Sequence, residues 1–175
     1  GAMIGTFRLV LSSEKPVRII LDEDRIDVTS KKILSEIKAI DEELSAHFVK
    51  SSEVIDINND SLLLIVDTQS PKIAMNEGLI EKFKRVAIID HHRTGDEGFV
   101  DTVFSYVEPY ASSTVELVSE MLNFYQKERI KVPAFEATIM LAGIVVDTNN
   151  FTFRCGSRTF ESASNLREYG ADMIE

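Results

Sequence analysis

The chain has 175 residues, 44% of them hydrophobic, and carries 19 basic against 29 acidic side chains, a formal charge of −10. This size and composition predict one compact domain with a substantial hydrophobic core. No apolar run is long enough to cross a bilayer, so we expect no membrane contact by this chain. An acidic surface repels a polyphosphate backbone, which excludes a long nucleic acid as a favoured partner. The single cysteine, Cys155, cannot form an internal disulfide and suits a cytoplasmic domain.

The N-terminal third is predicted to alternate helix and strand. Residues 1–3 have the composition of a cloning scar, so the native domain is expected to cover 4–175. An apolar helix is expected over 4–11, and the β-branched run 17–21 indicates a strand. From Ser30, the expected N-cap, apolar residues recur at three- and four-residue steps as far as Phe48, which predicts an amphipathic helix.

The middle of the chain has the pattern of a buried parallel sheet. Apolar runs at 62–66 and 86–89 predict two strands, and 73–83 leaves room for a crossover helix between them. Further helices are expected over 115–126, from Pro133 to Asp147 and over 159–168, with Gly170 as the stop signal of the last one. The predicted fold class is therefore α/β, an open and mainly parallel sheet with helices on both faces.

Acidic and imidazole side chains follow the apolar runs. In chain order they are Asp67, Asp90, His91, His92 and Asp147. The carboxyl ends of parallel strands meet at one edge of a sheet, so these side chains can converge there. Buried carboxylates need neutralising partners, and apart from Arg93 few basic residues lie beside them. A divalent cation would fill that need, and Asp with His suits manganese, iron or zinc.

Several candidate site residues could instead have an ordinary structural role. Asp67 could cap the helix that follows it. Ser113 could cap a helix or present N–H groups to an anion, and Arg158 could bind a phosphate or remain solvated. Arg93, Asn149, Ser113 and Arg158 are our candidate substrate contacts, together with His92.

Four motifs in the right order, and a fifth segment near the C-terminus, carry a family resemblance. They are Val66-Asp67-Thr68, Ile88-Ile89-Asp90-His91-His92-Arg93, Glu108-Pro109-Tyr110-Ala111-Ser112-Ser113-Thr114, Gly143-Ile144-Val145-Val146-Asp147-Thr148 and Gly156-Ser157-Arg158-Thr159-Phe160. Together they resemble the DHH superfamily of phosphoesterases, and most closely its GdpP-type cyclic-di-AMP phosphodiesterases. The resemblance runs over nearly the whole chain.

The resemblance implies a two-manganese centre. Asp67, Asp90, His91 and Asp147 would serve the metals, with Asp67 bridging both ions and Asp90 helping to hold the site together. Asp90, His91 and His92 would be the catalytic residues, with His92 facing the substrate phosphate. The implied reaction is attack of a metal-activated hydroxide on phosphorus, which opens cyclic-di-AMP to pApA.

Two parts of the family pattern are missing from this sequence. The first motif, a His followed by two Asp and a Gly, should precede Ile4, and the DHH-associated domain should follow Glu175. We therefore expect a partial DHH domain that holds at most one manganese ion weakly and has negligible turnover. The longer protein could be anchored in the bacterial membrane and could form a homodimer.

Other functions fit the same residues. A relative that hydrolyses short oligoribonucleotides or pyrophosphate would share every motif quoted. A non-catalytic module that binds a nucleotide is a third possibility, although a decayed site has no physical reason to keep Asp90, His91, His92 and Asp147 together.

Overall fold

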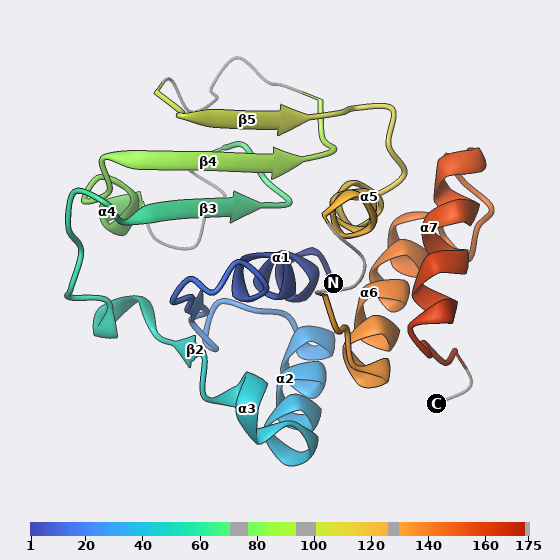
Figure 1. Cartoon of the computed structure of the whole chain (residues 1–175), viewed down its shortest axis with the longest axis horizontal. Coiled ribbons are helices and arrows are strands. Elements are labelled where there is room, and N and C mark those ends of the chain that lie inside the picture. The colour runs from blue at the N-terminus through green and yellow to red at the C-terminus, as the bar shows by residue number, and fades with distance from the viewer. Residues whose placement is uncertain (71–76, 94–100, 126–129, 174–175) are drawn as a thin grey trace.

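The main sheet consists of three parallel strands within the part of the chain that the structure describes. The structure is a computed structural model that describes residues 1–70, 77–93, 101–125 and 130–173. The strands, in spatial order, are β3 (Leu62–Val66), β4 (Arg85–Asp90) and β5 (Phe104–Val107). Ile65 lies opposite Ile88, and Ile89 lies opposite Tyr106. All three carboxyl ends therefore meet at one edge, on the right in Figure 1.

Most helices lie below and to the right of this sheet in Figure 1, and a small second sheet lies below it. The helices are α1 (Ala2–Leu11), α2 (Val28–Ile40), α3 (Glu42–Ser45), α4 (Glu77–Ile80), α5 (Thr114–Phe124), α6 (Ala134–Asp147) and α7 (Ser157–Glu168), with a 3-10 turn at Ser51–Glu53. The second sheet pairs the two short parallel strands β1 (Ile19–Ile20) and β2 (Phe48–Val49). The described helices include none that is long and apolar enough to span a membrane.

Alternate residues of the strands point to opposite faces of the main sheet. Leu64, Val66 and Ile89 face a large apolar cluster built with α1, α5, α6 and α7. Ile65 and Ile88 face a smaller cluster that includes Ile80 of α4. Four helices thus pack on one face and the single-turn helix α4 contacts the other, which confirms the predicted α/β class with a parallel sheet.

Local capping explains where several helices begin and end. The Ser113 hydroxyl accepts a hydrogen bond from the Glu116 N–H and so caps α5. At the end of α7, Gly170 has a φ of +93°, and the Ala171 N–H donates to the Leu166 carbonyl, as in a Schellman ending. The stop signal expected at Gly170 is therefore confirmed.

The helix expected from Ser30 to Phe48 is wrong at both ends. Its N-cap is Asp27, whose carboxylate accepts from the N–H groups of Thr29 and Ser30. The helix stops at Ile40 because Asp41 leaves the helical conformation and caps the short helix α3 instead. Phe48 belongs to strand β2. The heptad-like spacing continued across this break, so periodicity alone could not locate it.

Strand β5 was not predicted from the sequence. Its four residues are only half-buried or exposed, and they contain no continuous apolar run. It pairs with β4 alone in the described sheet, so an edge strand with a weak pattern was missed. A crossover helix was expected over 73–83. The structure has the single-turn helix α4 in this range, and 73–76 lie outside the described residues. Ala2 and Met3, from the supposed scar, form the start of α1.

Candidate metal centre

Asp67 directly follows β3 at the carboxyl edge of the sheet. Its φ is +67°, a left-handed conformation that costs a non-glycine residue on the order of 1–3 kcal/mol. Its N–H donates to the Ile89 carbonyl at 3.0 Å, and its Oδ1 accepts from the Thr114 hydroxyl at 2.7 Å. The side chain is nevertheless 51% exposed. Two neighbouring segments thus hold an exposed carboxylate in a strained conformation.

Asp90, the last residue of β4, organises the two histidines that follow it. Its side chain is fully buried, and its Oδ1 accepts from the His91 N–H at 2.9 Å and from the His92 Nδ1 at 2.7 Å. Its other oxygen, Oδ2, is buried and makes no hydrogen bond with residues that the structure describes. A buried carboxylate oxygen without a donor is costly, which favours a cationic ligand nearby.

The His91 ring is held from the other side of the site. Its Nδ1 lies 3.4 Å from the Ala111 carbonyl, and its Nε2 lies 3.8 Å from the Asp67 Oδ1. The rings of His91 and His92 lie 4.4 Å apart between centroids. The contact with Ala111 and the proximity of Asp67 orient the ring so that its Nε2 faces the Asp67 carboxylate.

Asp67, His91 and His92 form the group with metal-ligand spacing. One potential ligand atom from each residue lies within 4.8 Å of those of the other two. One ion bound at roughly 2.0–2.2 Å to each atom would hold them no more than about 4.4 Å apart, so the side chains would move slightly closer together on binding. One carboxylate and two imidazoles suit a first-row divalent metal. The residues present therefore fit such an ion, and the buried Asp90 oxygen beside them supports the same conclusion.

Negative charge dominates the electrostatics of this edge. Burial lowers the pKa of His92, but the hydrogen bond to Asp90 and the charges of Asp90, Asp67 and Asp147 outweigh it, so the pKa is raised overall. Desolvation and the charge of Asp67 raise the pKa of Asp147, against the opposing effect of the two histidines. The raised pKa values mark a place where carboxylates repel each other and added positive charge is stabilised.

The other predicted site residues are spread around this group. Asp147 ends α6 and lies outside the three-residue group, although its charge acts on it. Arg93 is exposed just after His92. Asn149 is also exposed and has a φ of +48°. The roles proposed for these three residues remain predictions.

Ser113 and Arg158 have well-defined protein partners. Ser113 is fully buried and caps α5. Arg158 makes two hydrogen bonds to Glu120, at 2.6 and 2.7 Å, and this pairing raises the pKa of its guanidinium. The structure brings neither side chain into the group with metal-ligand spacing, so their contact with a substrate also remains a prediction.

Sequence reasoning missed two supporting residues, Thr114 and Glu116. Thr114 was named only as the last residue of the motif that begins at Glu108, yet its hydroxyl donates a hydrogen bond to Asp67. Glu116 is buried and accepts from Ser112 at 2.6 Å and from Thr159 at 2.8 Å. The spacing of Ser113 and Glu116 is that of a capping box, a signal that could have pointed to Glu116.

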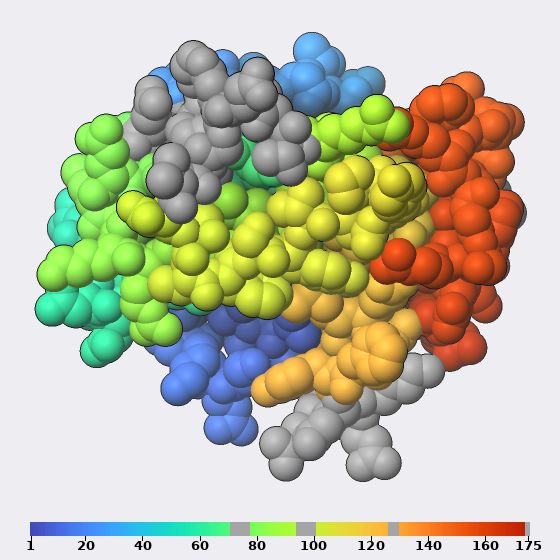
Figure 2. Space-filling view, turned by 90° about the horizontal axis from the view of Figure 1, so that it is seen from above, coloured from blue at the N-terminus to red at the C-terminus, as the bar shows by residue number. Residues whose placement is uncertain are grey.

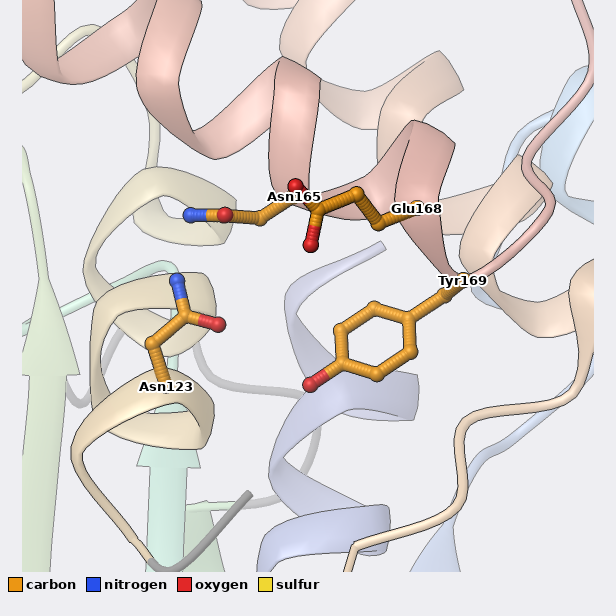
Figure 3. Close-up of a pocket in the computed structure, with 4 residues that line it drawn as sticks. All are labelled: Asn123, Asn165, Glu168 and Tyr169. Carbon is orange, nitrogen blue, oxygen red and sulfur yellow. The ribbon is translucent and has the colours of Figure 1, made fainter. Parts of the chain in front are cut away.

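A separate hollow of about 160 Å³ lies between α5 and α7. Asn123, Asn165, Glu168 and Tyr169 line it, as Figure 3 shows. The Asn123 Oδ1 and the Tyr169 hydroxyl are buried there without a hydrogen bond to the described residues. None of the predicted site residues lines this hollow, so it is distinct from the candidate metal centre.

An α/β domain with carboxylates and imidazoles at the carboxyl edge of a parallel sheet is the class defined by this geometry. Residues 2–144 match the model of the DHH family, N-terminal domain, and the chain belongs to that family. A crystal structure of an exopolyphosphatase-related protein from Bacteroides fragilis shares the fold, with a TM-score of 0.65 and 20% identity over 97% of this chain and 48% of that one.

Three curated relatives are similar to this chain in sequence. The chain is 45% identical to the cyclic-di-AMP phosphodiesterase GdpP of Bacillus subtilis (strain 168) over 99% of its own length. It is 37% identical to the cyclic-di-AMP phosphodiesterase PdeA of Listeria monocytogenes, again over 99% of its length. A probable manganese-dependent inorganic pyrophosphatase of Thermotoga maritima is 31% identical over 91% of this chain and 30% of its own length. The chain spans about a quarter, 26%, of the two phosphodiesterases.

Proposed function

We propose that this chain is part of the catalytic region of a cyclic-di-AMP phosphodiesterase, which opens the cyclic dinucleotide to pApA. The observation that carries the proposal is the grouping of Asp67, His91 and His92 at the edge of the sheet. The 45% identity to a cyclic-di-AMP phosphodiesterase over almost the whole chain supports the substrate class. The net charge of −10 favours a small phosphodiester over a long nucleic acid.

Manganese is the proposed metal. Asp67, His91 and His92 would hold one ion, and Asp147 would approach it from the end of α6. A relative named as manganese-dependent supports this identity. When bound, the ion would supply positive charge that offsets the phosphate and activates water.

The chain's own residues would orient the substrate around that charge. Asp90 fixes the His92 ring through Nδ1, which leaves Nε2 as the nitrogen that a metal or a phosphate would meet. The negative neighbours that raise the pKa of His92 favour its protonated form whenever no metal is bound. Asp90 is thus proposed to act on catalysis through His91 and His92, by holding both.

For the isolated chain, we propose one weak metal site and negligible turnover. The chain covers 26% of its phosphodiesterase relatives, and the described residues supply one group with metal-ligand spacing. Isothermal titration of the 175-residue chain with Mn²⁺ should therefore give at most one weak binding event. Two tight sites would contradict this proposal.

The activity should be tested in the full-length protein that contains this chain. Mn²⁺-dependent conversion of cyclic-di-AMP to pApA is measured by chromatography, with pApA and pyrophosphate as competing substrates. The double variant Asp90→Ala, His91→Ala should lose the conversion. His47→Ala is the matched control, because His47 lies elsewhere, with its ring against Phe7 and its Nδ1 at the Val17 carbonyl. Equal activity of the double variant would contradict the proposal.

Hydrolysis of pyrophosphate is the second candidate function. The 31% identity to a probable pyrophosphatase over 170 residues favours it, and the same metal group would serve. Short oligoribonucleotides belong to the same chemical class. Cleavage of pyrophosphate or pApA with cyclic-di-AMP left intact would establish this alternative and overturn the cyclic-di-AMP assignment.

A further inference from the structure

The first turn of α5 supports two of the three residues in the metal-ligand group. The Ala111 carbonyl, just before the helix, contacts the His91 ring at 3.4 Å. The Thr114 hydroxyl, in the first residue of the helix, donates to the Asp67 Oδ1 at 2.7 Å. A shift of this short segment would therefore move the partners of both residues at once.

Glu116 ties that segment together from inside the protein. Its side chain is only 3% exposed. Its Oε2 accepts from the Ser112 N–H at 3.3 Å and from the Ser112 hydroxyl at 2.6 Å, while its own N–H donates to the Ser113 hydroxyl. A capping-box glutamate would reach back to the N-cap residue, whereas this one reaches one residue further. It thereby fixes the residue that follows Ala111.

Glu116 also joins α5 to the start of α7. The Thr159 hydroxyl donates to the Glu116 Oε2 at 2.8 Å and accepts from the Gly156 N–H at 3.0 Å. The Arg158 Nε lies 3.8 Å from the Glu116 Oε1, although its hydrogen bonds go to Glu120. In Figure 2, the C-terminal part of the chain, in red, lies against the part that contains β5 and the start of α5, in yellow.

We propose that Glu116 is a positioning residue for the metal centre and that, with Thr159, it couples α7 to that centre. This inference rests on the proposed metal-dependent function. Glu116 contacts none of the three residues in the group and acts through Ser112, Ala111 and Thr114. A buried carboxylate can hold several donors rigidly because each hydrogen bond to a charged acceptor is strong.

The test measures Mn²⁺ affinity in the full-length protein by titration calorimetry, and unfolding by denaturant. Glu116→Gln keeps the shape but replaces one acceptor oxygen by a donor amide. We expect about a 10- to 100-fold loss of Mn²⁺ affinity, the range seen when an outer hydrogen-bond partner of a metal ligand is removed. Glu136→Gln is the matched control, a buried glutamate in the first turn of α6 that pairs with Arg8. It should leave Mn²⁺ affinity unchanged.

A pair of substitutions at Thr159 separates positioning from general stability. Thr159→Ser retains the hydroxyl and should retain Mn²⁺ affinity. Thr159→Val keeps the shape without the hydroxyl and should lower the affinity in the same direction as Glu116→Gln. Affinity that is unchanged in Glu116→Gln, or that falls equally in Glu136→Gln, would overturn the inference.

The two proposals fail in different ways. Wild-type protein that binds Mn²⁺ but leaves cyclic-di-AMP intact would overturn the proposed substrate, while the positioning role could still be confirmed from the affinities. Wild-type protein that binds no Mn²⁺ would overturn the metal-dependent function and the positioning role together.

Discussion

Buried carboxylates are neutralised at the contact between α1 and α6, but only in part at the carboxyl edge of the sheet. Glu136 of α6 is fully buried, and both of its oxygens accept hydrogen bonds from the Arg8 guanidinium. At the sheet edge, one oxygen of the buried Asp90 lacks a donor among the described residues, and Asp67 has a positive φ. The first region serves stability, whereas the second retains negative charge that a cation would offset.

The largest effect on stability is expected from Arg8→Met. This variant leaves Glu136 as a buried and unpaired carboxylate, which should lower the free energy of unfolding by about 3–5 kcal/mol at neutral pH. Denaturant unfolding measures the loss. Mn²⁺ affinity of the folded protein should not change, and a loss of affinity would contradict the separation between the two regions.

The same variant has a predicted pH dependence. Burial raises the pKa of Glu136, while the Arg8 hydrogen bond and charge lower it, so removing Arg8 should raise it further. A carboxyl with a raised folded-state pKa binds its proton more tightly when folded, so stability increases as the pH falls through that pKa toward the unfolded value. Unfolding at pH 5 and pH 7 should therefore show a smaller loss in Arg8→Met at pH 5.

Asp67→Asn should have the reverse effect of Arg8→Met, because it should weaken metal binding and leave stability intact. Asparagine adopts a positive φ readily and can still accept from Thr114, while the repulsion from Asp147 disappears. We expect the free energy of unfolding without metal to stay constant or to rise by up to about 1 kcal/mol. Mn²⁺ affinity should fall because the carboxylate charge is lost. Destabilisation by more than that amount would contradict the account of Asp67.

The smallest effects are expected from substitutions at two helix caps. Ser113→Ala and Asp27→Ala each remove a side chain that caps a helix, and each should cost about 0.5–2 kcal/mol in unfolding free energy. Only Ser113→Ala should also weaken Mn²⁺ binding, because α5 supports Asp67 and His91 whereas α2 packs against α3. Equal Mn²⁺ affinity in both variants would show that α5 does not support the metal site.

Strands and helices with strong apolar patterns could be predicted from the sequence, as could the strand-end position of Asp67 and Asp90. Strand β5 could not, because its residues are half-exposed, and neither could the break at Asp41, because the apolar spacing continues through it. At the site, the Asp and His residues could be predicted because they directly follow apolar runs in the sequence. The contact between Glu116 and Thr159 was not visible, because these residues lie 43 positions apart and meet only through the packing of α5 against α7.

We propose that Asp67, His91 and His92 hold a divalent cation. A crystal structure of the protein grown with Mn²⁺, with anomalous diffraction used to locate manganese, tests it most directly. The account predicts an anomalous peak within roughly 2.0–2.3 Å of ligand atoms from these three residues. Manganese bound elsewhere, with these three side chains uncoordinated, would contradict it.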